Sequence, residues 1–312
     1  LGRFHAQKYA AVEGSTLVGV VDAQERARTA VAAELGVPAF ADHRELIGRV
    51  DAVSIVTHTP SHFAIAADFL RAGVHVLVEK PMTETLEQAR ELCALATTTR
   101  RVLQVGHLER FNAAILAAEP YLKAPRFLEC QRLAPFKERG TDVNVVLDLM
   151  IHDIDIILHL VKSDVRNIYA SGVAVMTETP DIANVRIEFH NGCVANLSAS
   201  RMATKKMREI RIFQSDAYLS LDFMNQAGHL VKKSDIIAYG LKMKIGLVKA
   251  GDLSAIPVKE IPIEKGEPLA LELAHFVDSV TKAQQPKVGG ALGKSALEVA
   301  ITITEQIRAG QK

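Results

Sequence analysis

The sequence has 312 residues, of which 48% are hydrophobic and 23% are charged, so its length and composition are those of a globular protein with two domains. Because 37 basic residues nearly balance 36 acidic ones, the charge argues against nucleic acid and against an anionic membrane as a partner. Cys93, Cys130 and Cys193 are too widely spaced for a metal motif or a disulfide framework. No apolar run is as long as a membrane span, and the start of the chain lacks a signal pattern, so we expect a cytoplasmic protein without a bound metal.

The first third of the chain alternates short apolar strands with helices. The pattern predicts strands at 15–22, 51–57, 74–81 and 102–108, and helices at 23–36, 61–73 and 85–100. Ser61 is the expected N-cap of the second helix, and Gly73 marks its end. Strands that are buried on both faces and separated by helices indicate a doubly wound parallel sheet, so residues 1–110 are predicted to form a dinucleotide-binding Rossmann domain.

The remaining residues, 111–312, are predicted to form an α+β domain for substrate binding and oligomerisation. Strands are expected at 126–134, 167–176, 183–190, 193–200, 208–214 and 217–223, and helices at 113–121, 147–160, 269–282 and 291–309. Asn191-Gly192 suits a type I′ turn between two strands. The closely spaced strands indicate a large antiparallel sheet with helices on one side, and its open face is predicted to join subunits into a homodimer or homotetramer.

The opening residues, LGRFHAQKYA, are typical of the end of a glycine-rich dinucleotide turn running into its helix. Gly2 would then be the third glycine of that turn, the one that allows close packing of helix and strand. In this interpretation the first strand is missing from the sequence, and we expect an interruption in the middle of the parallel sheet. An ordinary helix at the start of the chain is the alternative.

Candidate cofactor-binding residues lie at the ends of the predicted strands 15–22, 51–57 and 74–81. Asp22 ends the second strand of a Rossmann fold, where a carboxylate accepts hydrogen bonds from the ribose hydroxyls and repels a 2′-phosphate, so NAD is favoured over NADP. Asp22 could instead cap the following helix. The stretch from Val56 to Phe63, VTHTPSHF, follows the next strand and also fits a simple capped turn.

The stretch from His75 to Met82, HVLVEKPM, ends a strand with Glu79, Lys80 and Pro81. Proline releases the chain from the sheet at this point, and a cis bond before it is one way to turn the chain. Lys80 would then face the ligand crevice and stabilise a developing alkoxide. The alternative is an exposed salt bridge at a turn.

The apolar helix at 147–160 carries a narrow polar stripe. In an α-helix, Asp148, His152, Asp155 and His159 would lie within about 60° of one another. Asp148 and His152 are four residues apart, so the carboxylate can orient the imidazole as a general base. A structural His–Asp pair and a metal site are the alternatives.

Taken together, these stretches resemble the Gfo/Idh/MocA family of nicotinamide-dependent sugar and cyclitol oxidoreductases. The resemblance covers nearly the whole chain and includes LGRFHA, VTHTPSHF, HVLVEKPM, VGHLERFN, the helix with Asp148 and His152, and the C-terminal helices. It implies that Lys80, Asp148 and His152 are the catalytic residues. It also implies cofactor contacts, which fall on Gly2, Arg3, Phe4, Asp22, Thr57, His58, Pro60, His62, Glu79 and Lys80.

Substrate contacts are expected at Asp148, His152, Arg110, Asn112, Lys205 and Arg208. The phrase DVNVVLDLMIHDIDI is most similar to the branch of UDP-N-acetylglucosamine 3-dehydrogenases, although Met150 stands where the family often has glycine. Lys205 and Arg208 would meet a diphosphate, or else belong to a solvated charged run.

The predicted function is therefore hydride transfer between NAD and a secondary hydroxyl of a sugar or nucleotide sugar. His152 is the expected proton acceptor and Lys80 polarises the oxygen, although the sequence also allows the reverse assignment. Two other functions stay open, a regulatory protein that binds the dinucleotide without catalysis and an epimerase or lyase with transient hydride transfer.

Overall fold

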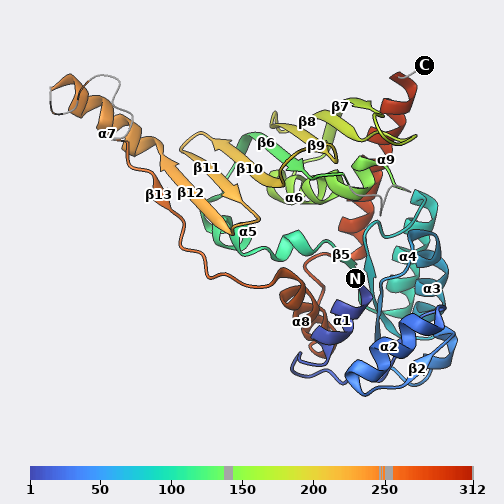
Figure 1. Ribbon diagram of the computed structural model, residues 1–312. Helices are drawn as coiled ribbons and strands as arrows, with labels where there is room; N and C mark the ends of the chain where they lie inside the picture. Colours follow the sequence, from blue (N-terminus) through green and yellow to red (C-terminus); the bar gives the residue numbers. More distant parts are fainter. Residues whose placement is uncertain (137–142, 246, 248, 250–255, 311–312) are drawn as a thin grey trace. The chain divides into compact units, whose positions relative to one another are not determined.

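The computed structural model describes residues 1–136, 143–245, 247, 249 and 256–310 (Figure 1). The chain divides into two compact units, of which unit 1 comprises Leu1–Phe111 and Glu267–Glu298, and unit 2 comprises Asn112–Gly266 and Val299–Lys312. The first switch between units lies one residue from the predicted boundary at 110. Residues 267–298 pack with unit 1, whereas the prediction placed them in the C-terminal domain.

Unit 1 is an α/β unit with parallel strands. Its strands are β1 (Val20–Val21), β2 (Ala39–Phe40), β3 (Ala52–Ile55), β4 (His75–Glu79) and β5 (Leu103–Gly106), and its main helices are α1 (Gly2–Tyr9), α2 (Glu25–Leu35), α3 (Thr59–Arg71), α4 (Leu86–Thr99) and α8 (Pro268–Thr281). Among the described residues, β1 pairs with β2 in one sheet, and β3, β4 and β5 form a second. The sheet is thus interrupted between β1 and β3, where the sequence predicts an interruption.

Local sequence explains where these helices begin and end. Thr85 accepts a hydrogen bond from the backbone of Gln88, whose side chain reaches back to the Thr85 backbone, so a capping box starts α4. Gly36 ends α2 in the left-handed conformation. The predicted N-cap at Ser61 is wrong, because α3 begins at Thr59 with Pro60 in its first turn and His58 as its N-cap.

The core of unit 1 depends on the returning C-terminal segment. Leu77 of β4 is fully buried against Leu273 and Phe276 of α8, and Tyr9 of α1 packs on the same cluster. Residues nearly two hundred positions apart therefore form one hydrophobic core.

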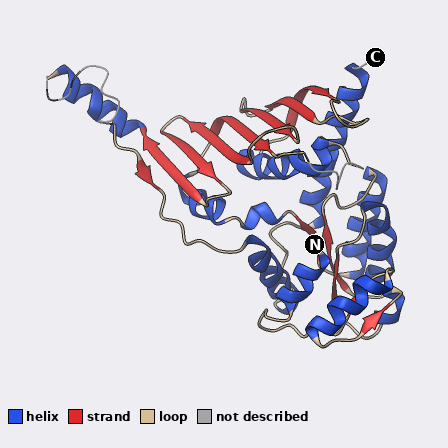
Figure 2. Ribbon diagram, viewed as in Figure 1, coloured by secondary structure: helices blue, strands red, loops and turns tan. Residues whose placement is uncertain are grey.

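Unit 2 is built on a large mixed sheet (Figure 2). Its strands are β6 (Pro125–Leu133), β7 (Val165–Val173), β8 (Ile182–Phe189), β9 (Val194–Ser200), β10 (Met207–Gln214), β11 (Ala217–Asp222), β12 (Ala227–Lys232) and β13 (Lys259–Glu260). Among the described residues their order is β13-β12-β11-β10-β6-β9-β8-β7, antiparallel except for the parallel pair β6–β9.

Helices cover one face of this sheet. α5 (Ala113–Ala118), α6 (Ile151–Val161) and the C-terminal part of α9 (Gly290–Gly310) belong to unit 2. Alternate residues of β6 show the two faces, because Leu128 and Cys130 are buried while Glu129 and Gln131 are not. The sheet therefore has a helix-covered face and an open face, as predicted.

Two details of unit 2 differ from the predictions. The β8–β9 hairpin is present, but only Gly192 has a positive φ, so the turn is not type I′. Instead, the Asn191 side chain accepts a hydrogen bond from the backbone of Cys193. The strand β12 and the helix α7 (Lys233–Lys244) were not predicted.

Candidate active site

The predicted ligand edge of unit 1 is the edge where β3, β4 and β5 end. The three strands are parallel and in register, with Ser54 beside Leu77 and Glu79 beside Gly106, so their carboxyl ends lie at one edge. Ligands bind outside the carboxyl ends of strands in open α/β sheets. Lys80 follows β4 at this edge and is partly buried. The Lys80–Pro81 bond is cis, which confirms that prediction.

His62 joins two of the loops at this edge. Its Nδ1 lies 2.9 Å from the carbonyl oxygen of Pro81, and its Nε2 lies 3.1 Å from that of Thr57. Burial lowers the pKa of His62, although the two carbonyl contacts act in the opposite direction. The ring therefore holds together the loops that follow β3 and β4, a structural role for a residue that was predicted to contact the cofactor.

The other predicted cofactor residues of the β3 loop are exposed. Thr57 and His58 precede α3, and Pro60 lies in its first turn. Glu79 is different, because it is 4% exposed and its carboxylate lies 3.1 Å from Nε2 of His5 in α1. Its contact is with the protein interior.

The start of α1 brings Gly2, Arg3 and Phe4 to the surface. A Cβ placed on Gly2 would lie 3.8 Å from that of Val56, an ordinary contact, so packing against Val56 does not require glycine. The close packing predicted for Gly2 is against the first strand of the fold, and it stays a prediction. Arg3 pairs with Glu34 at 2.8 Å, and Phe4 is exposed. Arg3 is thus engaged on the surface between α1 and α2.

Asp22 lies directly after β1 and is exposed. Its Oδ1 accepts a hydrogen bond of 2.8 Å from the backbone of Gln24, the residue that precedes α2. The carboxylate thus orders the turn between strand and helix, as in the alternative interpretation, and it stays at the surface where a ribose hydroxyl can reach it.

In unit 2, Asp148 and His152 lie on either side of a change in helix type. Val146–Met150 forms a π-helical segment, and the α-helix α6 begins at Ile151. The predicted α-helix over residues 147–160 is therefore wrong for its first residues, because the backbone there has the wider hydrogen-bond pattern of a π-helix. Asp148 and His152 are partly buried, whereas Asp155 is buried and His159 contacts Glu119 at 3.2 Å.

A buried ion pair that the sequence did not reveal anchors α6 to the sheet. Arg132 of β6 and Asp153 of α6 are 2% and 3% exposed, and their contacts are 2.7–3.1 Å long. Asp153 directly follows His152 in sequence. The pair therefore fixes the helix turn that carries His152, and the only sequence signal was an arginine at an inward position of β6.

The predicted substrate residues have different surroundings. Asn112 is buried. Its amide N–H donates to the carbonyl of Phe223, and its Oδ1 accepts from the backbone of Ala114 and so caps α5. These contacts occupy the side chain that was expected to bind substrate. Arg110 is only 2% exposed in a short 3₁₀ segment of unit 1. Lys205 and Arg208 are exposed, and Arg208 pairs with Arg132 across the β6–β10 register.

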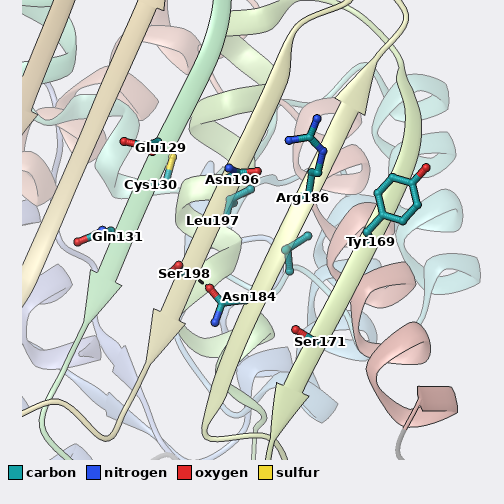
Figure 3. A pocket seen from close by; sticks show the side chains of 11 residues that line it. Glu129, Cys130, Gln131, Tyr169, Ser171, Asn184, Arg186, Asn196, Leu197 and Ser198 are labelled. Atoms are coloured by element: carbon teal, nitrogen blue, oxygen red, sulfur yellow. Dashed lines mark hydrogen bonds between the residues drawn. The ribbon is translucent and has the colours of Figure 1, made fainter.

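A shallow hollow lies elsewhere, on the open face of the unit 2 sheet (Figure 3). Polar side chains of neighbouring strands line it, and Ser198 donates to Asn184 at 2.7 Å. None of the predicted site residues lines this hollow.

Two family models match the chain. The model of the oxidoreductase family with an NAD-binding Rossmann fold, Gfo/Idh/MocA, matches residues 1–107, and the model of the Gfo/Idh/MocA C-terminal domain matches residues 118–220. The chain belongs to the Gfo/Idh/MocA oxidoreductase family.

Individual family members show the same relationship. A UDP-N-acetylglucosamine 3-dehydrogenase of Acidithiobacillus ferrooxidans is 39% identical over 99% of this chain and 95% of its own length. A scyllo-inositol 2-dehydrogenase (NAD(+)) of Bacillus subtilis is 25% identical, covering 99% of this chain and 92% of its own. The solved structure of the Acidithiobacillus protein, GnnA, matches with a TM-score of 0.89 at 38% identity, covering 99% of this chain and 94% of that one.

The family binds NAD, and the surroundings of unit 1 fit that cofactor. Asp22 offers a surface carboxylate after β1, which suits ribose hydroxyls. The helix α1 begins at Gly2, and the backbone N–H groups at a helix start suit a phosphate. The protein is thus an oxidoreductase of the Gfo/Idh/MocA family with an NAD-binding Rossmann fold.

The described residues offer no metal-binding cluster and no helix that could span a membrane. No three His, Cys, Asp or Glu side chains in that part of the chain are grouped as a metal ion requires. No helix there is long and apolar enough to cross a membrane.

Proposed function

We propose that this Gfo/Idh/MocA protein oxidises the 3-hydroxyl of the sugar ring of UDP-N-acetylglucosamine. The observation that carries the proposal is the 39% identity with a UDP-N-acetylglucosamine 3-dehydrogenase over 99% of the chain. The more distant inositol dehydrogenase also acts on a ring hydroxyl, but its identity is 25%. The cytoplasmic location expected from the sequence stays a prediction.

Three side chains are assigned roles in removing the proton of the reacting hydroxyl and in stabilising its oxygen. NAD, when bound, supplies the hydride acceptor. His152 takes the hydroxyl proton at its imidazole, Asp148 orients that ring, and Lys80 donates a hydrogen bond to the oxygen as negative charge develops on it. The position of Lys80 at the carboxyl end of β4 and the Asp153 anchor beside His152 support these assignments.

The diphosphate of the substrate needs cations in unit 2. Arg208 is the second residue of β10 and lies opposite Arg132 on the helix-covered face. Asp153, the partner of Arg132, adjoins His152 in sequence. Lys205 is exposed in the preceding turn. We therefore assign Arg208, with Lys205, to the diphosphate, since guanidinium groups bind phosphate oxygens with paired hydrogen bonds.

The test of the function is an activity assay with a small panel of substrates. The purified protein is incubated with NAD and UDP-N-acetylglucosamine, UDP-glucose or scyllo-inositol, and NADH absorbance is followed. NADH is expected with UDP-N-acetylglucosamine at a kcat/KM at least about tenfold above the others, the factor that one hydrogen bond to the acetamido group provides. A preference for the inositol, or sugar conversion without net NADH, would refute the proposal.

The open face of the unit 2 sheet is proposed as the subunit interface of a homodimer or homotetramer. Phe127, Phe213 and Tyr218 form an aromatic cluster, and Phe213 is 36% exposed. Aromatic residues are enriched in interfaces. Phe213→Glu is expected to lower the molar mass measured by light scattering, whereas Ile47→Glu, at an exposed apolar residue of unit 1, should not. An unchanged mass for Phe213→Glu would contradict this interface.

A further inference from the structure

A single buried histidine connects three elements of unit 1. His5 of α1 is 2% exposed, its Nδ1 lies 2.9 Å from Oγ of Ser54 in β3, and its Nε2 lies 3.1 Å from Oε1 of Glu79 in β4. An ionised carboxylate can only accept hydrogen bonds, so Nε2 of His5 donates to Glu79.

The same carboxylate is held on its other sides. Its Oε2 accepts a hydrogen bond of 3.3 Å from the backbone N–H of Lys80. A Cβ on Gly106 of β5 would come within 2.9 Å of the Glu79 carboxyl carbon, so the carboxylate lies directly over Gly106 and a larger residue there would displace it. Glu79 is thus fixed between β5, the ring of His5 and the first backbone amide of the Lys80 loop.

We propose that His5 is a positioning residue for Lys80 and acts through Glu79. This inference rests on the role of Lys80 in the proposed function. The buried carboxylate needs its histidine donor, because an unsatisfied carboxylate in the interior is costly and would move towards water. Such a movement carries the Lys80 backbone with it. His5 therefore links α1, the helix whose start suits the cofactor phosphates, to the residue that faces the reacting oxygen.

Two substitutions separate the contacts of the ring. In His5→Gln the longer side chain places its amide near the position of Nε2 and can still donate to Glu79, whereas in His5→Asn the shorter amide lies near Nδ1 and reaches only Ser54. His5→Asn is expected to lower kcat by about tenfold to a hundredfold, the cost of misplacing a catalytic group by about 1 Å. The KM for NAD should change less than about threefold, and His5→Gln should recover most of the loss.

The controls test the contact and not the fold. Ser54→Ala removes the other partner of the same ring and should lower kcat by less than about threefold. His43→Asn breaks a histidine–carboxylate contact of similar length, 3.0 Å from Nε2 to Asp68, at a partly exposed place in the same unit, and should leave kcat unchanged. If His5→Asn is as active as the parent, or if His5→Gln loses as much activity as His5→Asn, the inference is wrong.

A double variant identifies the residue through which His5 acts. In a Lys80→Ala background, His5→Asn should cause no further loss of kcat, because the group that it positions is absent. A further loss of tenfold would show that His5 acts elsewhere and would overturn the inference alone. Lys80→Ala with parental activity would refute the role of Lys80 in the proposed function, and the inference with it.

Discussion

Removing one charge of the ion pair between Arg132 and Asp153 should strongly destabilise unit 2. Asp153→Asn keeps the shape of the side chain and removes its charge. Because three contacts of 2.7–3.1 Å join the two groups and both residues are at most 3% exposed, water cannot replace the lost carboxylate. Leaving a buried guanidinium without its counter-charge costs about 3–5 kcal/mol. We therefore expect the unfolding free energy to fall by that amount, or about two to four decades in the equilibrium constant.

Urea unfolding, followed by circular dichroism, measures this loss. The midpoint should fall while the slope with urea stays the same, since the substitution does not change the surface exposed on unfolding. Glu129→Gln is the matched control on the same strand, because its contact with Arg211 is 3.7 Å long and both side chains are about two-fifths exposed. Such a pair contributes at most about 1 kcal/mol.

The reasoning also predicts how the pair behaves when both partners are replaced. Arg132→Met combined with Asp153→Leu removes both buried charges together, so it should be more stable than either single variant. If Asp153→Asn lies within about 1 kcal/mol of the parent, the pair is effectively solvated and the argument from its burial fails.

Three further predictions concern the site in unit 1 and the catalytic assignments. Asp22→Ser should lower the ratio of the NADP to the NAD dissociation constant by about tenfold to a hundredfold, because one hydrogen bond to a charged group contributes about that factor. The dissociation constants of both cofactors measure this ratio. Lys80→Ala and His152→Ala should each lower kcat by about two to four decades with little change in NAD affinity, which steady-state kinetics and a binding titration would show. Burial lowers the pKa of His62 below its ordinary 6.5. Below that pH the unfolded chain therefore binds a proton at His62 more readily than the folded chain does, so the free energy of unfolding should fall as the pH drops below 6.5. His62→Gln should weaken that dependence in urea midpoints measured across this range, and an unchanged dependence would contradict the assignment to His62.

Features that depend on local sequence were predicted well. The start of α4 follows from Thr85 and Gln88, which form the capping box, and the end of α2 follows from Gly36. The approach of Lys80 to the ligand edge also follows from local sequence, because the end of a buried parallel strand is marked by Glu79 and Pro81. These residues determine backbone conformation within a few positions of themselves.

Features that depend on hydrogen-bond pattern or on distant partners were not predicted. The π-helical segment Val146–Met150 has the same apolar composition as the α-helix that follows it, so periodicity cannot distinguish them. The helix α7 has apolar residues on several sides, including exposed Ile236, Ile237 and Leu241, and therefore lacks the one-sided pattern of an amphipathic helix. The contact of His5 with Glu79 joins residues 74 positions apart and leaves no local signal.

The discontinuous composition of unit 1 has a consequence for the order of folding during synthesis. Leu77 is covered by Leu273 and Phe276, which the ribosome adds only after all the strands of the unit 2 sheet. Domains usually fold as units in the order of their synthesis, but here the N-terminal segment must wait with part of its apolar surface uncovered. Unit 2 can complete its sheet first, and the nascent N-terminal segment is the part of this chain most exposed to aggregation and to chaperone binding.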